Sequence, residues 1–295
     1  MKRKKSLSVF VALIVLVPAC LGVFLFGHSD DSTENGGQSH TVKFISHYID
    51  VGQGDSEFIE FPDGKTMLID AGTDKYGETV TDYIKNLGYS KIDYLVGTHP
   101  HADHIGGMAD VVNAFDIGSI YMPNASTNTK TFENLLETIQ DKGMTINTAK
   151  AGMNIVFSEA EEYSADILAP IKDEYDDLNN YSVVIKITYG DSEFLYMGDA
   201  EKEVEGELLE SGTDVKADVI KAGHHGSNTS SSSDFVKAVG ADYVIFSAGK
   251  DNDYGHPHPQ IIKRWENVGA EIYRTDEDGT VVISSDGRSI TADAA

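Results

Sequence analysis

The sequence predicts an α/β domain in which mixed β-sheets are covered by helices. A pattern of hairpin, helix and strand recurs roughly twice between residue 41 and the C-terminus. The 295-residue chain is 40% hydrophobic and contains 28 glycines, a composition that suits an adequate core and many turns. These observations together predict a turn-rich α/β domain.

In the first half of this domain, a predicted hairpin is followed by alternating helices and strands. Pro62-Asp63-Gly64 is the turn signal between the two hairpin strands. A segment with helical spacing ends at Gly88, which suits a helix C-cap. We expect strands at Val42–Asp50, Glu57–Phe61, Thr66–Asp70 and Ile92–Val96, and helices at Val80–Leu87, Ile105–Phe115 and Thr131–Lys142.

The second half repeats the pattern. A second hairpin is predicted around Gly190-Asp191, between two apolar strands. Helices and strands then alternate to the end of the chain. We expect strands at Val183–Thr188, Phe194–Met197, Val215–Lys221, Tyr243–Phe246, Ile272–Arg274 and Thr280–Ser284, and helices at Glu201–Glu210, Asp234–Val239 and Gln260–Val268.

The N-terminal segment has the pattern of a membrane anchor. Leu7–Phe26 carries no charge and follows the basic cluster Lys2–Lys5. A helix of about 20 residues matches a hydrocarbon core of ~30 Å. We therefore interpret residues 1–27 as a signal anchor or signal peptide, residues 28–40 as a flexible linker, and residues 41–295 as the motif-bearing domain.

This segment also predicts where the protein is located. Basic residues stay on the cytoplasmic side, so we expect a single-pass protein of the cell membrane with an extracellular domain. Two alternatives are a lipoprotein attached through Cys20, within Val17-Pro18-Ala19-Cys20, and a secreted protein whose signal peptide is cleaved. Cys20 is the single cysteine, which excludes an intrachain disulfide.

The net charge of −25 restricts the possible partners. A strongly acidic surface repels nucleic acid and anionic membranes at long range. Any phosphate-bearing substrate must therefore be attracted by a local positive source, for which a bound metal is the obvious candidate. A protein partner cannot be predicted from the sequence.

A cluster of potential metal ligands follows the apolar strand at Ile92–Val96. His99, His101, Asp103 and His104 stand within six residues, where a strand ends and a helix begins. A tight turn at such a place can direct all four side chains into one cavity. Neutral imidazole and carboxylate groups suit zinc or manganese.

Three further segments place polar residues in loops or at strand ends. Asp199 follows an apolar strand, and a carboxylate there can bridge two metals about 3.5–4 Å apart. His224 and His225 follow another strand, so that one can ligate metal while the other contacts the leaving group or orients water. His256 and His258 lie in a loop made rigid by prolines and are candidate ligands or general acids.

These motifs together resemble the metallo-β-lactamase superfamily, and more narrowly the extracellular hydrolase domain of ComEC-type DNA-uptake proteins. The resemblance covers Val42 to about Ile283 and implies a four-layer αββα sandwich of two mixed sheets flanked by helices. The segments that carry it are Ile49-Asp50-Val51-Gly52-Gln53-Gly54-Asp55-Ser56, Leu68-Ile69-Asp70-Ala71-Gly72, the His99–His104 cluster, Asn179-Asn180-Tyr181-Ser182, Gly198-Asp199-Ala200-Glu201, His224-His225-Gly226-Ser227 and Gly255-His256-Pro257-His258-Pro259.

The chain departs from the family pattern at two places. ComEC-type domains commonly carry Asp at the position of His101, so this cluster is more complete than theirs. The broader superfamily also has a metal-binding histidine between the histidine cluster and the bridging aspartate, whereas this chain has none from Ile105 to Gly223. Asn180 and Ser182 stand near that position and are candidate substrate-binding residues. One metal is therefore expected to be loosely held, or completed by water or substrate.

The resemblance and the residue chemistry together imply a site with two divalent ions, zinc or manganese. The predicted metal ligands are His99, His101, Asp103, His104, Asp199 and His225. Asp103 is also expected to orient the attacking water, and His224 to act beside the metals. His256 or His258 would contact the substrate phosphate or protonate the leaving oxygen, and Ser227 would donate to a phosphate oxygen.

The function predicted from these features is an extracellular metal-dependent hydrolase, a phosphodiesterase or nuclease acting on DNA or another phosphodiester. The expected partners are the membrane, through the N-terminal segment, and a phosphodiester substrate such as DNA. The resemblance implies DNA, while the acidic surface argues against tight duplex binding. One alternative is a non-catalytic surface protein that binds DNA. Another is an amide hydrolase of the β-lactamase type. A single hydrophobic segment excludes a transport channel.

Overall fold

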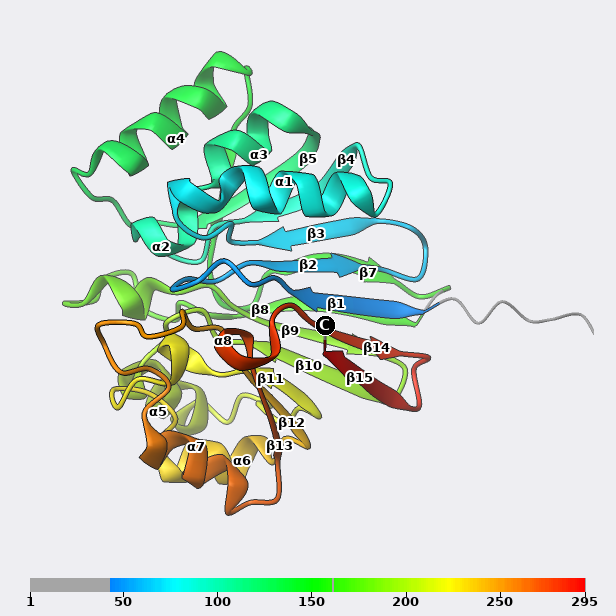
Figure 1. Cartoon of the computed structure of the whole chain (residues 1–295), viewed down its shortest axis with the longest axis vertical. Coiled ribbons are helices and arrows are strands. Elements are labelled where there is room, and N and C mark those ends of the chain that lie inside the picture. The colour runs from blue at the N-terminus through cyan, green and yellow to red at the C-terminus, as the bar shows by residue number, and fades with distance from the viewer. Residues whose placement is uncertain (1–42, 161, 295) are drawn as a thin grey trace, which may run out of the picture. The chain divides into compact units, whose positions relative to one another are not determined.

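The structure is a computed structural model that describes residues 43–160 and 162–294. Two mixed β-sheets pack against each other, and helices cover the outer face of each, which confirms the predicted αββα sandwich (Figure 1). No helix within these residues is long and apolar enough to cross a membrane. The predicted anchor in residues 1–27 and the predicted linker in residues 28–40 lie outside the described residues.

The first sheet has the strand order β15-β14-β1-β2-β3-β4-β5-β6, so that strands from both ends of the domain pair within it. Three helices, α1 (Gly77–Asn86), α3 (Met108–Ala114) and α4 (Lys130–Asp141), cover its outer face (Figure 1). The strands are β1 (Phe44–Tyr48), β2 (Glu57–Glu60), β3 (Thr66–Ile69), β4 (Lys91–Val96), β5 (Asp116–Pro123), β6 (Ile146–Ala149), β14 (Val281–Ser285) and β15 (Ile290–Ala294).

The second sheet has the order β13-β12-β11-β10-β9-β8-β7. Its outer face is covered by α5 (Lys202–Glu210), α6 (Ser233–Val239) and α7 (Pro259–Glu266). The strands are β7 (Asn154–Ser158), β8 (Tyr163–Ala169), β9 (Val184–Tyr189), β10 (Ser192–Tyr196), β11 (Val219–Lys221), β12 (Tyr243–Phe246) and β13 (Glu271–Arg274). Short helical turns complete the fold: η1 (Asp74–Tyr76), α2 (Ala102–Ile105), η2 (Leu178–Tyr181), η3 (Gly223–Gly226) and α8 (Thr275–Asp278).

The main core lies between the two sheets. Alternating residues of β1, including Phe44 and Tyr48, point from the first sheet toward the second. Phe44 packs on Phe194 with ring centroids 4.5 Å apart, and Tyr48 stacks on Tyr196 at 6.0 Å. Because strands of both sheets are anchored in this core, the loops that leave them at one edge are held in fixed positions.

The expected helix at Ile105–Phe115 is interrupted in the structure. It is divided into α2 and α3 at Gly106-Gly107. A Cβ atom on Gly106 would lie 2.3 Å from the backbone nitrogen of Asp74, and one on Gly107 would lie 2.3 Å from the carbonyl oxygen of Ala71. The two glycines therefore allow the segment that carries His104 to pack directly against the chain that follows β3.

Candidate metal centre

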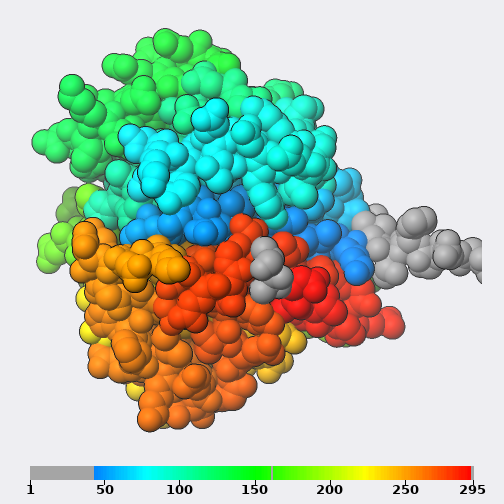
Figure 2. Space-filling view, in the orientation of Figure 1, coloured from blue at the N-terminus to red at the C-terminus, as the bar shows by residue number. Residues whose placement is uncertain are grey.

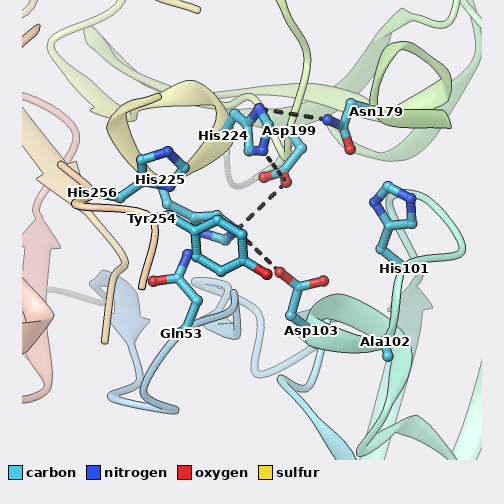
Figure 3. Close-up of a pocket in the computed structure, with 10 residues that line it drawn as sticks. All are labelled: Gln53, His101, Ala102, Asp103, Asn179, Asp199, His224, His225, Tyr254 and His256. Atoms are coloured by element: carbon cyan, nitrogen blue, oxygen red, sulfur yellow. Dashed lines mark hydrogen bonds and ion pairs between the residues drawn. The ribbon is translucent and has the colours of Figure 1, made fainter. Parts of the chain in front are cut away.

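The carboxyl ends of strands from both sheets meet at one pocket of about 350 Å³. The loop after β4 carries the first histidine cluster, the loop after β10 carries Asp199, and η3 follows β11. Because β10, β11 and β12 run parallel, the loops that follow them lie at the same edge of their sheet. Figure 3 shows the lining residues: Gln53, His101, Ala102, Asp103, Asn179, Asp199, His224, His225, Tyr254 and His256.

Asp199 is the centre of the arrangement. Its carboxylate is buried, and Oδ2 lies near the Nε2 atoms of four histidines. The distances are 3.3 Å to His104, 3.5 Å to His225, 3.6 Å to His224 and 3.9 Å to His99. This one carboxylate therefore connects the cluster after β4 with the two histidines after β11.

His104 is oriented by a carboxylate behind it. Its Nδ1 lies 2.7 Å from Oδ2 of Asp70, and Thr98 donates to both oxygens of that carboxylate, from its backbone nitrogen and its hydroxyl. With Nδ1 engaged, Nε2 of His104 faces Asp199. A carboxylate that holds the far nitrogen of an imidazole is the usual support of a metal-ligating histidine.

His225 is oriented by a backbone carbonyl and by an unusual backbone. Its Nδ1 lies 2.9 Å from the carbonyl oxygen of Ser247, which leaves Nε2 facing Asp199 and Asp103. His224 and His225 both adopt left-handed conformations, with φ of 48° and 53°. This conformation is costly for residues other than glycine. It places two successive imidazoles on the same pocket, with His225 buried and His224 partly exposed.

His99 and His101 form the other side of the site. Nε2 of His99 lies 3.0 Å from Nδ1 of His101, and Nδ1 of His99 lies 3.1 Å from the hydroxyl of Thr98. Burial, together with the neighbouring His104, holds the pKa of His99 well below its ordinary value. His99 is therefore a neutral imidazole that has a lone pair available for a ligand.

Asp103 approaches His225 from the α2 side, with Oδ2 at 3.6 Å from Nε2. Burial raises the pKa of Asp103, but the interactions with His225 and His104 outweigh it and lower the pKa below the ordinary value. For His104 and His225, burial lowers the pKa, while Asp199 and further aspartates outweigh burial and raise it well above the ordinary value. The pocket floor is thus strongly negative and favours cations.

A buried ion pair beneath the pocket includes two residues that the sequence motifs did not identify as site residues. Lys221, the last residue of β11, is fully buried, contacts the carboxylate of Asp55 and donates to the carbonyl oxygen of Gly198 at 2.9 Å. Asp55 also lies 3.1 Å from Nδ1 of His225, and Lys221 lies 3.9 Å from Asp199. The available signal for Lys221 was a charged residue at the end of an apolar strand, and for Asp55 it was a position in a segment that carries the family resemblance.

The residues predicted to bind substrate lie in different surroundings. Asn180 bonds to Glu203 and to the backbone of Glu201, whereas its neighbour Asn179 lines the pocket. Ser182 lies beneath the site, 3.4 Å from Nδ1 of His99, and accepts from the backbone nitrogen of Asp199. The hydroxyl of Ser227 accepts from Thr229 and is absent from the pocket lining.

The two histidines of the proline-rich loop are also separated by the structure. His256 lines the pocket, and its Nδ1 is buried without a hydrogen-bond partner among the described residues. Burial and the neighbouring His225 lower the pKa of His256 to about 4. His258 lies behind it, with ring centroids 5.1 Å apart, and its Nδ1 faces the carbonyl oxygen of Gly255.

The side chains present fit divalent metal ions. Among the described residues, buried Oδ1 of Asp199 and Nε2 of both His104 and His225 have no hydrogen-bond partner. Ligand atoms of His99, His104 and Asp199 lie within 4.8 Å of one another, as do those of Asp103, His104 and His225. Buried, unpaired imidazole nitrogens and carboxylate oxygens at these spacings form a donor set that suits zinc or manganese.

Comparison with known proteins agrees with this geometry. Residues 49–250 match the family model described as Metallo-beta-lactamase superfamily. The chain belongs to this superfamily. ComE operon protein 3 of Bacillus subtilis (strain 168) is 29% identical over 250 residues, covering 79% of this chain and 32% of that protein. Competence protein ComA of Neisseria gonorrhoeae is 26% identical over 283 residues, covering 93% and 38%.

The chain thus spans about a third of the length of these competence proteins, and the predicted relationship to the ComEC type is confirmed. Among solved structures, CmlA, a diiron beta-hydroxylase from Streptomyces venezuelae, has a TM-score of 0.52 at 15% identity, covering 78% of this chain and 52% of that one. At this identity the likeness shows the fold alone. Superfamily membership and the His/Asp clusters support a metal-dependent hydrolase.

Proposed function

We propose that this protein is an extracellular metal-dependent phosphodiesterase that acts on nucleic acid. The observation that carries the proposal is the position of Asp199, whose buried carboxylate faces imidazoles supplied by both sheets. A carboxylate placed in this way can serve two adjacent cation positions. The candidate ligands are His99, His101, Asp103, His104, Asp199 and His225.

Divalent ions in such a site would lower the pKa of water and neutralise phosphate oxygens. The cations also explain how an acidic chain binds an anion. The ligand pocket is negative without them, as the raised pKa values of His104 and His225 indicate. Two divalent ions bound there would add positive charge that attracts a phosphodiester to the pocket while the rest of the surface stays acidic.

Proton transfer and the remaining substrate contacts would come from residues of the chain itself. His224 is oriented by Glu201, whose Oε1 lies 3.1 Å from Nδ1, so that Nε2 is directed toward Asp199. This pair is suited to move a proton to the leaving oxygen. His256 has a pKa of about 4 and is neutral at pH 7, so it accepts a hydrogen bond instead of acting as an acid. Asn179 lines the pocket and supplies a polar contact for substrate.

The test is hydrolysis by the full-length chain in detergent, loaded with manganese or zinc. We expect turnover of a chromogenic phosphodiester and of DNA, loss of turnover with a chelator, and recovery when metal is restored. Hydrolysis of a β-lactam without phosphodiester turnover would contradict the proposal. Metal-loaded protein that binds DNA without cleaving it would instead identify a non-catalytic receptor.

A further inference from the structure

Tyr254 is an exposed aromatic side chain at the rim of the pocket. Its relative exposure is 66%, although it lines the same cavity as Asp103 and His225. In Figure 3 it stands in the foreground with Gln53 and His256 on its side of the pocket, while His101 lies on the other side. An aromatic ring this exposed contributes little to folding stability, and single exposed rings are common, so the case for a function depends on the position of Tyr254 at the pocket.

The ring is held by a rigid loop. The side chain of Asn252 donates to the carbonyl oxygens of Gly249 and His256, at 2.8 and 2.6 Å. Its Oδ1 accepts from the backbone nitrogens of Tyr254 and His256, at 3.2 and 3.0 Å. The backbone nitrogen of Gly249 in turn donates to Gln53. The loop that carries Tyr254 is therefore fixed before substrate arrives.

One face of the ring is stacked on an imidazole, and most of the side chain is exposed. The imidazole of His256 lies against Tyr254 with centroids 5.6 Å apart and planes inclined by 23°, an offset stack. No other aromatic contact of Tyr254 is found among the described residues. The exposed area therefore includes a flat π-face next to the cavity where the phosphodiester would be cleaved.

The charge of the site indicates what this face binds. None of the ten residues that line the pocket is lysine or arginine, and the whole chain carries a net charge of −25. The site therefore lacks the basic groove by which proteins usually follow a phosphate backbone. With no cation in the pocket lining, affinity beyond the scissile phosphate can come from an uncharged contact such as stacking of a base on an aromatic ring.

We propose that Tyr254 is a stacking platform for an unpaired nucleobase beside the scissile phosphodiester, which makes single-stranded nucleic acid the substrate class. This inference rests on the proposed phosphodiesterase function. A base within a duplex is stacked on both faces and cannot offer one to a side chain without leaving the helix. Stacking is tolerant of base identity, so the platform selects strandedness and not sequence.

The experiment compares the metal-loaded full-length wild type with Tyr254→Ala and Tyr254→Phe. The substrates are a single-stranded oligonucleotide and the same strand with abasic residues around the cleaved bond. Tyr254→Ala should raise KM on the normal strand by about 5–150-fold, the range that corresponds to stacking of one base. Tyr254→Phe should retain the wild-type KM. On the abasic strand all three proteins should have the same, raised KM.

Phe157→Ala is the matched control. Phe157 has the same 66% exposure but lies on β7 and does not line the pocket, so its replacement should leave KM unchanged. Binding of a short labelled oligonucleotide, measured by anisotropy, gives a readout that does not depend on turnover. Its affinity should fall only weakly with salt, with a logarithmic slope near −0.7 for each phosphate contacted.

The results separate this inference from the proposed function. If the wild type cleaves single strands and Tyr254→Ala keeps the wild-type KM and affinity, the stacking role of Tyr254 is wrong, while the proposed phosphodiesterase function is unaffected. Metal-loaded wild type that cleaves no phosphodiester would overturn the function, while the anisotropy still tests stacking. An equal loss by Tyr254→Ala on methyl 4-nitrophenyl phosphate would assign the ring to an aryl leaving group and overturn the nucleobase.

Discussion

Replacement of Lys221 by methionine should destabilise the protein strongly, because it leaves a buried carboxylate without its cation. Lys221 is fully buried, contacts Asp55 and donates to the carbonyl oxygen of Gly198 at 2.9 Å. Burial lowers the pKa of Lys221, but Asp55 and Asp199 outweigh it and raise the pKa above its ordinary value. Lys221 is therefore positively charged at neutral pH.

The expected magnitude follows from the burial of both partners. Removing one member of a buried, hydrogen-bonded ion pair costs about 3–5 kcal/mol of unfolding free energy. Because Lys221→Met keeps most of the side-chain volume, the loss of unfolding free energy reflects removal of the charge and not creation of a cavity. Asp55→Asn in the same chain removes the carboxylate that lost its partner. The double variant should therefore recover most of the lost stability.

Urea denaturation of the four proteins, with metal removed by a chelator, measures these values without linkage to metal binding. Lys65→Met serves as the control, because Lys65 forms an exposed pair with Asp63 at 2.8 Å and its loss should cost no more than about 1 kcal/mol. A cost for Lys221→Met as small as that of the control would refute the reasoning. So would a double variant whose cost equals the sum of the two single costs.

Four further predictions concern the metal centre and the location of the domain. Asp199→Ala should abolish phosphodiester turnover and lower metal content, as measured by elemental analysis; normal activity would rule out a shared carboxylate. His256→Ala should lower turnover by about 2–10-fold with metal content unchanged, as expected for the loss of one hydrogen bond, and a loss of metal would instead make His256 a ligand. Without metal, the raised pKa values of His104 and His225 keep both imidazoles protonated near neutrality. Metal must then displace these protons, so the affinity of the site for metal should rise with pH. Calorimetry in two buffers of different ionisation enthalpy measures the proton release, and its absence would contradict the prediction. Protease added to intact cells should remove the domain, because Lys2–Lys5 precede the apolar segment, and full protection would place it inside.

The parts of the site that could be predicted from sequence are those in which neighbours along the chain are also neighbours in space. The four residues from His99 to His104 occupy one turn, so their spacing alone indicated a common cavity. Asp55 and Lys221 are separated by 166 positions and meet only through the packing of the two sheets. A single sequence shows no such pairing. Asn179 and Asn180 illustrate a finer limit, because the direction of each side chain depends on the turn at η2.

For the fold, too, local features could be predicted from the sequence and long-range pairings could not. Hairpins and amphipathic helices were predicted because their signals are local, as for β2 with β3 and for α4. The strand β5 was not predicted. It contains Gly118, where a Cβ atom would lie 2.4 Å from the carbonyl oxygen of Asp93 on β4. A glycine required by a neighbouring strand weakens the local strand pattern, and its cause is visible only when the two strands are paired.

The strand order has a consequence for the time at which the protein becomes functional during synthesis. β14 pairs with β1 in antiparallel register, from Phe44 opposite Ser285 to Tyr48 opposite Val281. β1, the first strand among the described residues, therefore leaves the ribosome long before β14, the strand that covers its edge, has been made. The candidate ligands after β4 are made long before Asp199 and His225, so the nascent chain carries only part of the candidate ligand set. Metal bound by this candidate set would consequently be captured late, and a prematurely terminated chain would both lack part of the set and expose the edge of β1.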